Sequence, residues 1–200
     1  AAHHSDNPHG MLMGLPGIKI AFPSSAADFK GLLIESIREP NPVVFFADLM
    51  LLGKKGDVPE GAYSIEFGQA DVKREGTDVT VVAIGSTVPQ ALEVADQLAE
   101  TGVSVEVIDP RTLVPFDWDA VAKSVSKTGR LVAVDPNRET CGAASEIITQ
   151  AVERCWSQLK AQPQRVTWPN VPMPYSPPLE KAVVSDLDDI RRAIELTLKS

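Results

Sequence analysis

Residues 79–109 read VTVVAIGSTVPQALEVADQLAETGVSVEVID, and this stretch decides the fold class. It opens with a β-branched run, continues with apolar residues at helical spacing and closes with a second β-branched run. Gly102 stands where a glycine commonly ends a helix. A strand, a helix and a strand joined by short connections form a βαβ unit, whose strands are parallel. The stretch therefore predicts an α/β domain built on a parallel sheet.

The same alternation continues toward the C-terminus. We expect a helix over 117–129, a strand over 130–135, a helix over 142–160, a strand over 164–168 and a final helix from about residue 185. Asp117 and Ser185 are the predicted N-caps, because short polar side chains accept hydrogen bonds from the first turn of a helix. This order predicts an open, doubly wound α/β domain over residues 78–200.

A second βαβ unit precedes this domain. We expect a strand over 18–22, a helix over 24–40 capped by Ser25 and Asp28, and a strand over 41–48 that is buried on both faces. Residues 51–77 are rich in glycine and charge and have no sustained period. We interpret them as a linker, with at most a short strand near 62–67.

Composition narrows the possible function. The 200 residues are 44% hydrophobic and 23% charged, which is typical of a folded globular protein. The formal charge of −8 argues against a nucleic-acid or anionic-membrane surface, and no apolar run is long enough to span a membrane. Two cysteines, Cys141 and Cys155, are too few for a disulfide framework, and we expect both to be reduced and buried. The first residues lack an initiating Met, so we expect a processed or truncated chain.

Familiar catalytic motifs are absent from the sequence: there is no dinucleotide-binding glycine motif, Walker A loop, HExxH or G-x-S-x-G. Gly85 in AIGST either offers backbone amides to an anion or simply makes a tight turn. Cys141 is either a reactive thiol at a helix start or a packed one. The acidic end of the chain either receives a basic partner or forms a solvated helix face; its carboxylates are Asp186, Asp188, Asp189 and Glu195.

All three histidines, His3, His4 and His9, fall within the first nine residues. Imidazole is the side chain best suited to moving protons near neutral pH, so one interpretation is a catalytic segment. The alternatives are weak metal ligation and the remnant of a purification tag. Composition leaves these three interpretations open.

Several stretches, read together, resemble one enzyme family. The His4–Ser5 pair is followed by LPGIKIAFPSSAADFKGLLIESIREPNPVVFFAD (15–48), and VEVIDPRTLVPFD (105–117) and PMPYSPPLE (172–180) come later. The chain resembles the β subunit of the thiamine-diphosphate-dependent E1 component of 2-oxo acid dehydrogenases. This family includes the pyruvate, branched-chain 2-oxo acid and acetoin dehydrogenases.

The resemblance implies a domain plan and an activity. Residues 1–50 would be the end of a pyrimidine-type thiamine-enzyme domain, residues 51–77 the linker, and residues 78–200 a transketolase C-terminal-like domain. The family decarboxylates a 2-oxo acid and reductively acylates the lipoyl group of E2. His4 falls on the family histidine that helps this acyl transfer, whereas His3 would only be its neighbour and His9 matches no family position we can name.

The resemblance also implies cofactors and partners. Thiamine diphosphate and Mg²⁺ would be held by a preceding segment and by the α subunit, so we expect this chain alone to be inactive. A potassium ion would be bound by Ser36, Ile37, Glu39 and Asn41. The partners would be the E1 α subunit, a second β subunit and the subunit-binding domain of E2, in the bacterial cytoplasm or the mitochondrial matrix.

Two other functions remain open: another thiamine enzyme of the transketolase kind, and a non-catalytic module that only docks E2. The first would need a sugar-phosphate clamp with histidine in the C-terminal half, where this sequence has none. The segment Asp135–Gly142 departs from the family pattern, so the resemblance assigns it no role.

Overall fold

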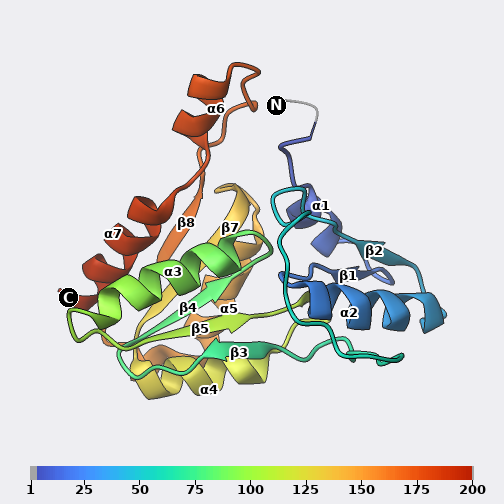
Figure 1. The fold of residues 1–200 in the computed structure, drawn as a ribbon. Helices are drawn as coiled ribbons and strands as arrows, with labels where there is room; N and C mark the ends of the chain where they lie inside the picture. Colours follow the sequence, from blue (N-terminus) through green and yellow to red (C-terminus); the bar gives the residue numbers. More distant parts are fainter. Residues whose placement is uncertain (1–3, 200) are drawn as a thin grey trace.

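The computed structural model describes residues 4–199, which form two sheets side by side (Figure 1). The helices are α1 (His9–Met13), α2 (Ala26–Arg38), α3 (Thr87–Ala99), α4 (Trp118–Thr128), α5 (Ala143–Cys155), α6 (Pro177–Val183) and α7 (Leu187–Leu198), with a 3₁₀ turn η1 (Trp156–Gln158). The strands are β1 (Lys19–Ala21), β2 (Val43–Phe45), β3 (Asp71–Arg74), β4 (Val79–Ala83), β5 (Val105–Asp109), β6 (Thr112–Val114), β7 (Leu131–Arg138) and β8 (Gln164–Trp168).

The larger sheet has the strand order β3-β5-β4-β7-β8. β4 pairs in parallel with both β5 and β7, and β7 pairs in parallel with β8. Helices α3 and α7 cover one face of the sheet, and α4 and α5 cover the other (Figure 1). The predicted doubly wound α/β domain is thereby confirmed.

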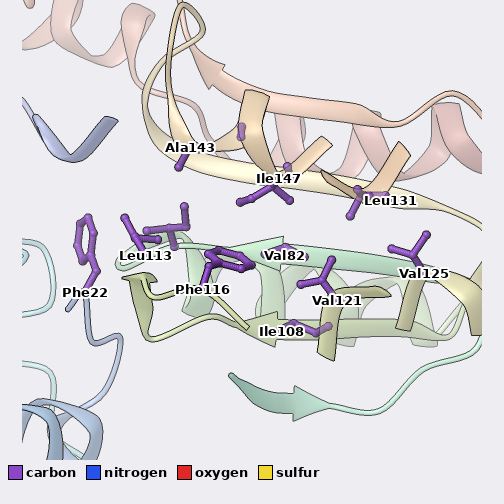
Figure 2. Packing of buried hydrophobic residues seen from close by; sticks show 14 of the residues in the cluster. Phe22, Val82, Ile108, Leu113, Phe116, Val121, Val125, Leu131, Ala143 and Ile147 are labelled. Atoms are coloured by element: carbon purple, nitrogen blue, oxygen red, sulfur yellow. The ribbon is translucent and has the colours of Figure 1, made fainter. Parts of the chain in front are cut away.

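Alternation along the central strands creates two hydrophobic cores. On β4, Val79 and Val81 face the α3/α7 side, whereas Val82 faces the α4/α5 side. Successive side chains of a strand point to opposite faces, so each face receives its own set of apolar residues. Figure 2 shows the α4/α5 side, where Val121 of α4 and Ile147 of α5 pack against the same face of the sheet.

The smaller sheet has the order β2-β1-β6 and carries α2. The Ser25 side chain accepts a hydrogen bond from the Asp28 backbone amide at 3.1 Å, as the sequence predicted. β2 is only half-buried rather than buried on both faces, because it is the edge strand of this sheet.

β6 connects the two sheets. It follows β5 of the larger sheet in the chain, yet it pairs antiparallel with β1 of the smaller one, with Ile20 opposite Val114. Leu113 and Phe22 lie at the same end of the α4/α5 core (Figure 2). The hydrophobic core therefore continues from one sheet into the other.

Three local expectations were wrong. The strand expected near 62–67 is instead β3, which extends the larger sheet as an antiparallel edge. The proline-rich turn before the last helix contains α6, which starts with two prolines. The cap of α7 is Asp186 rather than Ser185, because Asp186 and Asp189 form a reciprocal capping box.

Candidate functional site

Residues 4–8, which we call the His4 segment, precede α1. The His4 side chain is exposed. His3 lies outside the described residues. The His4 segment belongs to neither sheet, but several of its side chains contact other parts of the chain.

Polar contacts tie the His4 segment to the C-terminal half of the chain. The Ser5 hydroxyl donates a hydrogen bond to Glu180 in α6. The Asp6 carboxylate lies 2.8 Å from Arg138 in β7, and the Asn7 amide donates to the Pro136 carbonyl at 3.0 Å. Because these contacts come from three neighbouring residues, they fix the path of the backbone next to His4.

His9, the first residue of α1, is completely buried. Its Nε2 lies 2.7 Å from Oδ1 of Asp135, which is also buried. The rings of Phe22 and Phe46 approach the imidazole edge-on, at centroid distances of 5.3 and 5.8 Å. A polar ring enclosed by aromatic side chains is tolerated because its hydrogen bond compensates for the lost hydration.

Gly10 lets α1 approach the loop before α5 closely. A Cβ at this position would lie 2.7 Å from the Cys141 carbonyl oxygen and 3.0 Å from the Asn137 side chain. Real Cβ atoms are not found this close to a backbone oxygen, so only glycine fits here without a shift of the backbone.

The predicted potassium ligands lie together at the C-terminal end of α2, far from the start of the chain (Figure 1). Ser36 and Ile37 are in the last turn, where helical carbonyls lack intrahelical donors. The Glu39 carboxylate accepts from the Asn41 side chain at 2.6 Å and lies 2.5 Å from Lys19 Nζ. The hydrogen bond from Lys19, followed by that from Asn41, lowers the pKa of Glu39. The ammonium of Lys19 thus pairs with the Glu39 carboxylate at this helix end.

A buried polar cluster joins α2 to the larger sheet. Lys73 in β3 contacts Asp28 and Asp71, both at 2.7 Å, and Asp109 lies 3.8 Å away. Burial raises the pKa of Asp109 to about 6, against the hydrogen bond from Ser24. Asp28 is also buried, but hydrogen bonds from Lys73 and Ser25 outweigh that burial and hold its pKa below the ordinary value.

Surface hollows also occur among the described residues. One of about 620 Å³ is bounded by Gly10 and Met13 of α1, by Trp118 and by Cys141. A second, of about 360 Å³, lies between the start of α2 and residues 51–56. A third, of about 470 Å³, lies between β8 and α7. The first of these hollows adjoins the elements that anchor the His4 segment.

The other sequence candidates have mostly structural roles. Gly85 has a φ of +55°, and a Cβ there would lie 2.5 Å from the Phe22 ring, so the glycine makes a tight turn. The Ser86 amide next to it donates to the Asp48 carboxylate at 2.9 Å, which leaves no need for a bound anion. Both cysteines are free, and Cys155 is buried as expected. The expectation for Cys141 was wrong: its side chain is exposed, in a loop where its φ is +57°.

Part of the acidic end is engaged within the chain. Asp186 and Asp189 form the cap of α7, and Asp189 also pairs with Arg192. Within residues 4–199, no group of three or more His, Cys, Asp or Glu side chains lies close enough to hold a metal ion. No helix of the described part of the chain is long and apolar enough to cross a membrane.

Sequence reasoning missed the pairing of His9 with Asp135. The signal was present in part: Asp135 follows the buried run LVAV, and polar residues at the carboxyl ends of parallel strands often serve sites. The partner could not be identified, because 126 positions separate the two residues.

Comparison with known proteins identifies relatives of this sequence. The sequence model of the family described as "Transketolase, C-terminal domain" matches residues 68–190. The β subunit of acetoin:2,6-dichlorophenolindophenol oxidoreductase of Bacillus subtilis is 43% identical over 95% of this chain and 56% of its own length. The β subunit of the pyruvate dehydrogenase E1 component of the same organism is 41% identical over 86% of this chain and 54% of its own length.

A solved structure shows the same fold. It is titled "Split gene transketolase, inactive beta4 tetramer" and has a TM-score of 0.76 at 23% identity, over 95% of this chain and 60% of that one. The chain thus spans somewhat more than half the length of the curated relatives it matches. With the family match covering more than half of its residues, this chain belongs to the transketolase C-terminal domain family and is similar, over nearly its whole length, to E1-type β subunits.

Proposed function

We propose that this chain is part of the β subunit of a thiamine-diphosphate-dependent E1 enzyme that oxidatively decarboxylates a 2-oxo acid. In this proposal, residues 1–50 close the pyrimidine-type domain, residues 51–77 link it, and residues 78–200 form the assembly domain. The enzyme acts in the bacterial cytoplasm or, in a eukaryote, in the mitochondrial matrix.

The observation that carries the proposal is the similarity to E1-type β subunits over 86–95% of the chain. The structure supports it at one point in particular: the segment with the family's His-Ser pair is anchored, while the His4 side chain remains exposed. An exposed imidazole on an anchored segment suits a group that must reach a substrate bound by a neighbouring chain.

The chain fits only part of the cofactor site. Its described residues present no acidic cluster for Mg²⁺, and the sequence has no GDG-type motif for the diphosphate. When bound, thiamine diphosphate supplies the electron sink that lets a 2-oxo acid lose CO₂. In our proposal its anchors lie on the α subunit and on a further segment of the β subunit, and His4 is what this chain contributes.

His4 would act during transfer of the acyl group to lipoamide. One sulfur of the lipoyl disulfide receives the acyl group, the S–S bond breaks, and the other sulfur leaves as a thiolate. The disulfide is the oxidant, and His4 donates the proton that converts the thiolate to a thiol.

A potassium site at the end of α2 is a second part of the proposal. The carbonyls of Ser36 and Ile37 and the polar groups of Glu39 and Asn41 lie at one helix end, whose dipole favours a cation. Replacing potassium by sodium would lower the unfolding temperature if the ion binds, and the variant Glu39→Gln would lose this difference. An identical unfolding temperature in the two salts would exclude the site.

Acetoin is a second candidate substrate, favoured by the acetoin oxidoreductase relative at 43% identity. The two substrates are distinguished by a dye-linked assay of the assembled enzyme with pyruvate, with 2-oxoisovalerate and with acetoin. If the enzyme turns over acetoin but neither 2-oxo acid, acetoin is the substrate in place of the 2-oxo acid that we propose.

We further propose that the assembly domain contacts the α subunit and a second β subunit and docks the basic subunit-binding domain of E2. Asp188 and Glu195 are the carboxylates of the acidic end that lie outside the cap of α7. Affinity for that domain should fall with salt and in an Asp188→Lys variant, because the attraction is electrostatic. Binding that is indifferent to both changes would contradict this docking mode.

The central experiment uses the full-length β subunit assembled with its α subunit. His4→Ala should reduce reductive acylation of a lipoyl domain by about a hundredfold or more, the usual scale for loss of a general acid. Lys123→Ala, an exposed change on α4, serves as the matched control. Full acylation activity in His4→Ala would refute the catalytic role and favour a module that only docks E2.

A further inference from the structure

Asp135 is the point where the start of the chain meets the C-terminal half. It is 1% exposed, and its two carboxylate oxygens have different partners. Oδ1 lies 2.7 Å from His9 Nε2, whereas Oδ2 accepts from the Ala144 backbone amide in the first turn of α5 at 3.0 Å. One buried side chain therefore links the start of α1 to the start of α5.

The neighbouring residues continue this connection along the Asp135–Gly142 segment. The Pro136 carbonyl accepts from Asn7, Arg138 pairs with Asp6, and the Cys141 carbonyl lies against Gly10. From Asp6 to His9 the contacts run in opposite directions along the two stretches, whereas Gly10 faces the far end of the segment. Their density indicates that this segment, to which the family resemblance assigns no role, supports the His4 segment.

The imidazole of His9 has two nitrogens that can form hydrogen bonds, and Asp135 engages one of them, Nε2. Its Nδ1 is buried and has no hydrogen-bond partner among residues 4–199. An apolar side chain would suit the space between Phe22 and Phe46 without leaving a polar atom unsatisfied. The imidazole is therefore explained better by its bond to Asp135 than by packing.

We propose that Asp135, acting through His9, is a positioning residue that fixes the His4 segment, with the Asp135–Gly142 segment as its support. This inference rests on the proposed function, in which His4 serves acyl transfer. Leu12 and Met13 pack against the hydrophobic core. Loss of the Asp135 contact should therefore loosen residues 4–10 and leave the rest of α1 docked.

The first test follows backbone hydrogen exchange in this chain, without any cofactor. Asp135→Ala and His9→Leu should speed exchange of the Met11 amide, which donates to the Pro8 carbonyl at 3.1 Å, by at least about tenfold, while the amides of β4 and β7 keep their protection. His9→Gln should restore slow exchange, because its amide nitrogen reaches about as far as Nε2 and donates a hydrogen bond. Asp135→Asn should give an intermediate rate, since one of its two oxygens is retained.

Unchanged exchange of the Met11 amide in both Asp135→Ala and His9→Leu would overturn the inference. So would a uniform rise across β4 and β7, because it would show a general role in stability. If Asp135→Ala does not fold, the comparison of His9→Leu with His9→Gln decides between these outcomes.

The second test uses the assembled enzyme and compares two reactions. Asp135→Ala should lower reductive acylation of a lipoyl domain at least about fivefold more than it lowers the dye-linked rate. In a His4→Ala background it should have no further effect on acylation, because residues that act through one group are not additive. Additive effects would refute positioning through His4. Unchanged acylation in His4→Ala would refute the proposed function instead, and the positioning role in catalysis would fall with it, whatever the exchange data show.

Discussion

The ammonium of Lys73 in β3 lies 2.7 Å from the carboxylate of Asp28 in α2, and this ion pair joins the smaller sheet's helix to the edge of the larger sheet. Lys73 is 17% and Asp28 5% exposed, so water screens the pair only weakly. Asp109 stands 3.8 Å from the same ammonium, and Arg111 approaches the other carboxylate oxygen of Asp28 at 3.4 Å.

Lys73→Met should therefore destabilise the chain by about 3 kcal/mol, because it leaves the carboxylates without their central cation. Urea unfolding measures this difference. Lys123→Met, an exposed change on α4, should shift the unfolding free energy by less than about 0.5 kcal/mol. Equal effects of the two variants would show that the pair contributes little.

Asp109 should make stability fall as pH rises from about 4 to about 6. Burial raises its pKa in the folded state from 3.8 to about 6, so over this range the folded chain keeps a proton that the unfolded chain has released. The contribution is fully present below the unfolded pKa and is lost as pH passes the folded pKa, with a total of roughly 3 kcal/mol.

The isosteric variant Asp109→Asn cannot titrate, so it should lack this part of the pH dependence. Unfolding free energies of both proteins between pH 4 and pH 7 provide the measurement. Parallel curves for the two proteins would mean that Asp109 has the same pKa in both states.

Gly10→Ala should cost about 1–3 kcal/mol, because its Cβ would lie 2.7 Å from the Cys141 carbonyl and force α1 away from the loop. Gly14→Ala is the matched control at the other end of α1, since a Cβ there meets no atom of the described residues within 4 Å. Thermal unfolding compares the two. If both variants behave alike, the close approach at Gly10 is not a constraint.

Asp186→Ala should destabilise α7 by about 1 kcal/mol, as is usual for loss of an N-cap. Ser185→Ala should cost less, because Ser185 is not the cap. The two unfolding free energies check the revised start of this helix, and the reverse order would restore the expectation from the sequence.

The larger sheet was predictable because its central strands are rich in β-branched residues and each connecting helix carries a clear apolar face. Ser25 and Asp117 are caps in the structure as expected, since N-capping depends on neighbouring residues only. β3 and β6 were missed because they are short and are stabilised by pairing with distant strands.

The candidate site was less accessible to sequence reasoning. His4 came from family resemblance, and its role remains a prediction. The bond between His9 and Asp135 joins opposite parts of the chain, and only the folded backbone brings them to 2.7 Å. Exposure of Cys141 was also missed, because its φ of +57° depends on the loop rather than on its neighbours in sequence.

The pairing of β6 with β1 limits where this protein can be divided into fragments. A cut anywhere in residues 51–70 severs the chain once but divides the smaller sheet, since β1 would stay on one piece and its partner β6 on the other. Neither piece would then hold all three strands of the smaller sheet. Chimeras of homologous subunits should accordingly take both sheets from the same parent protein.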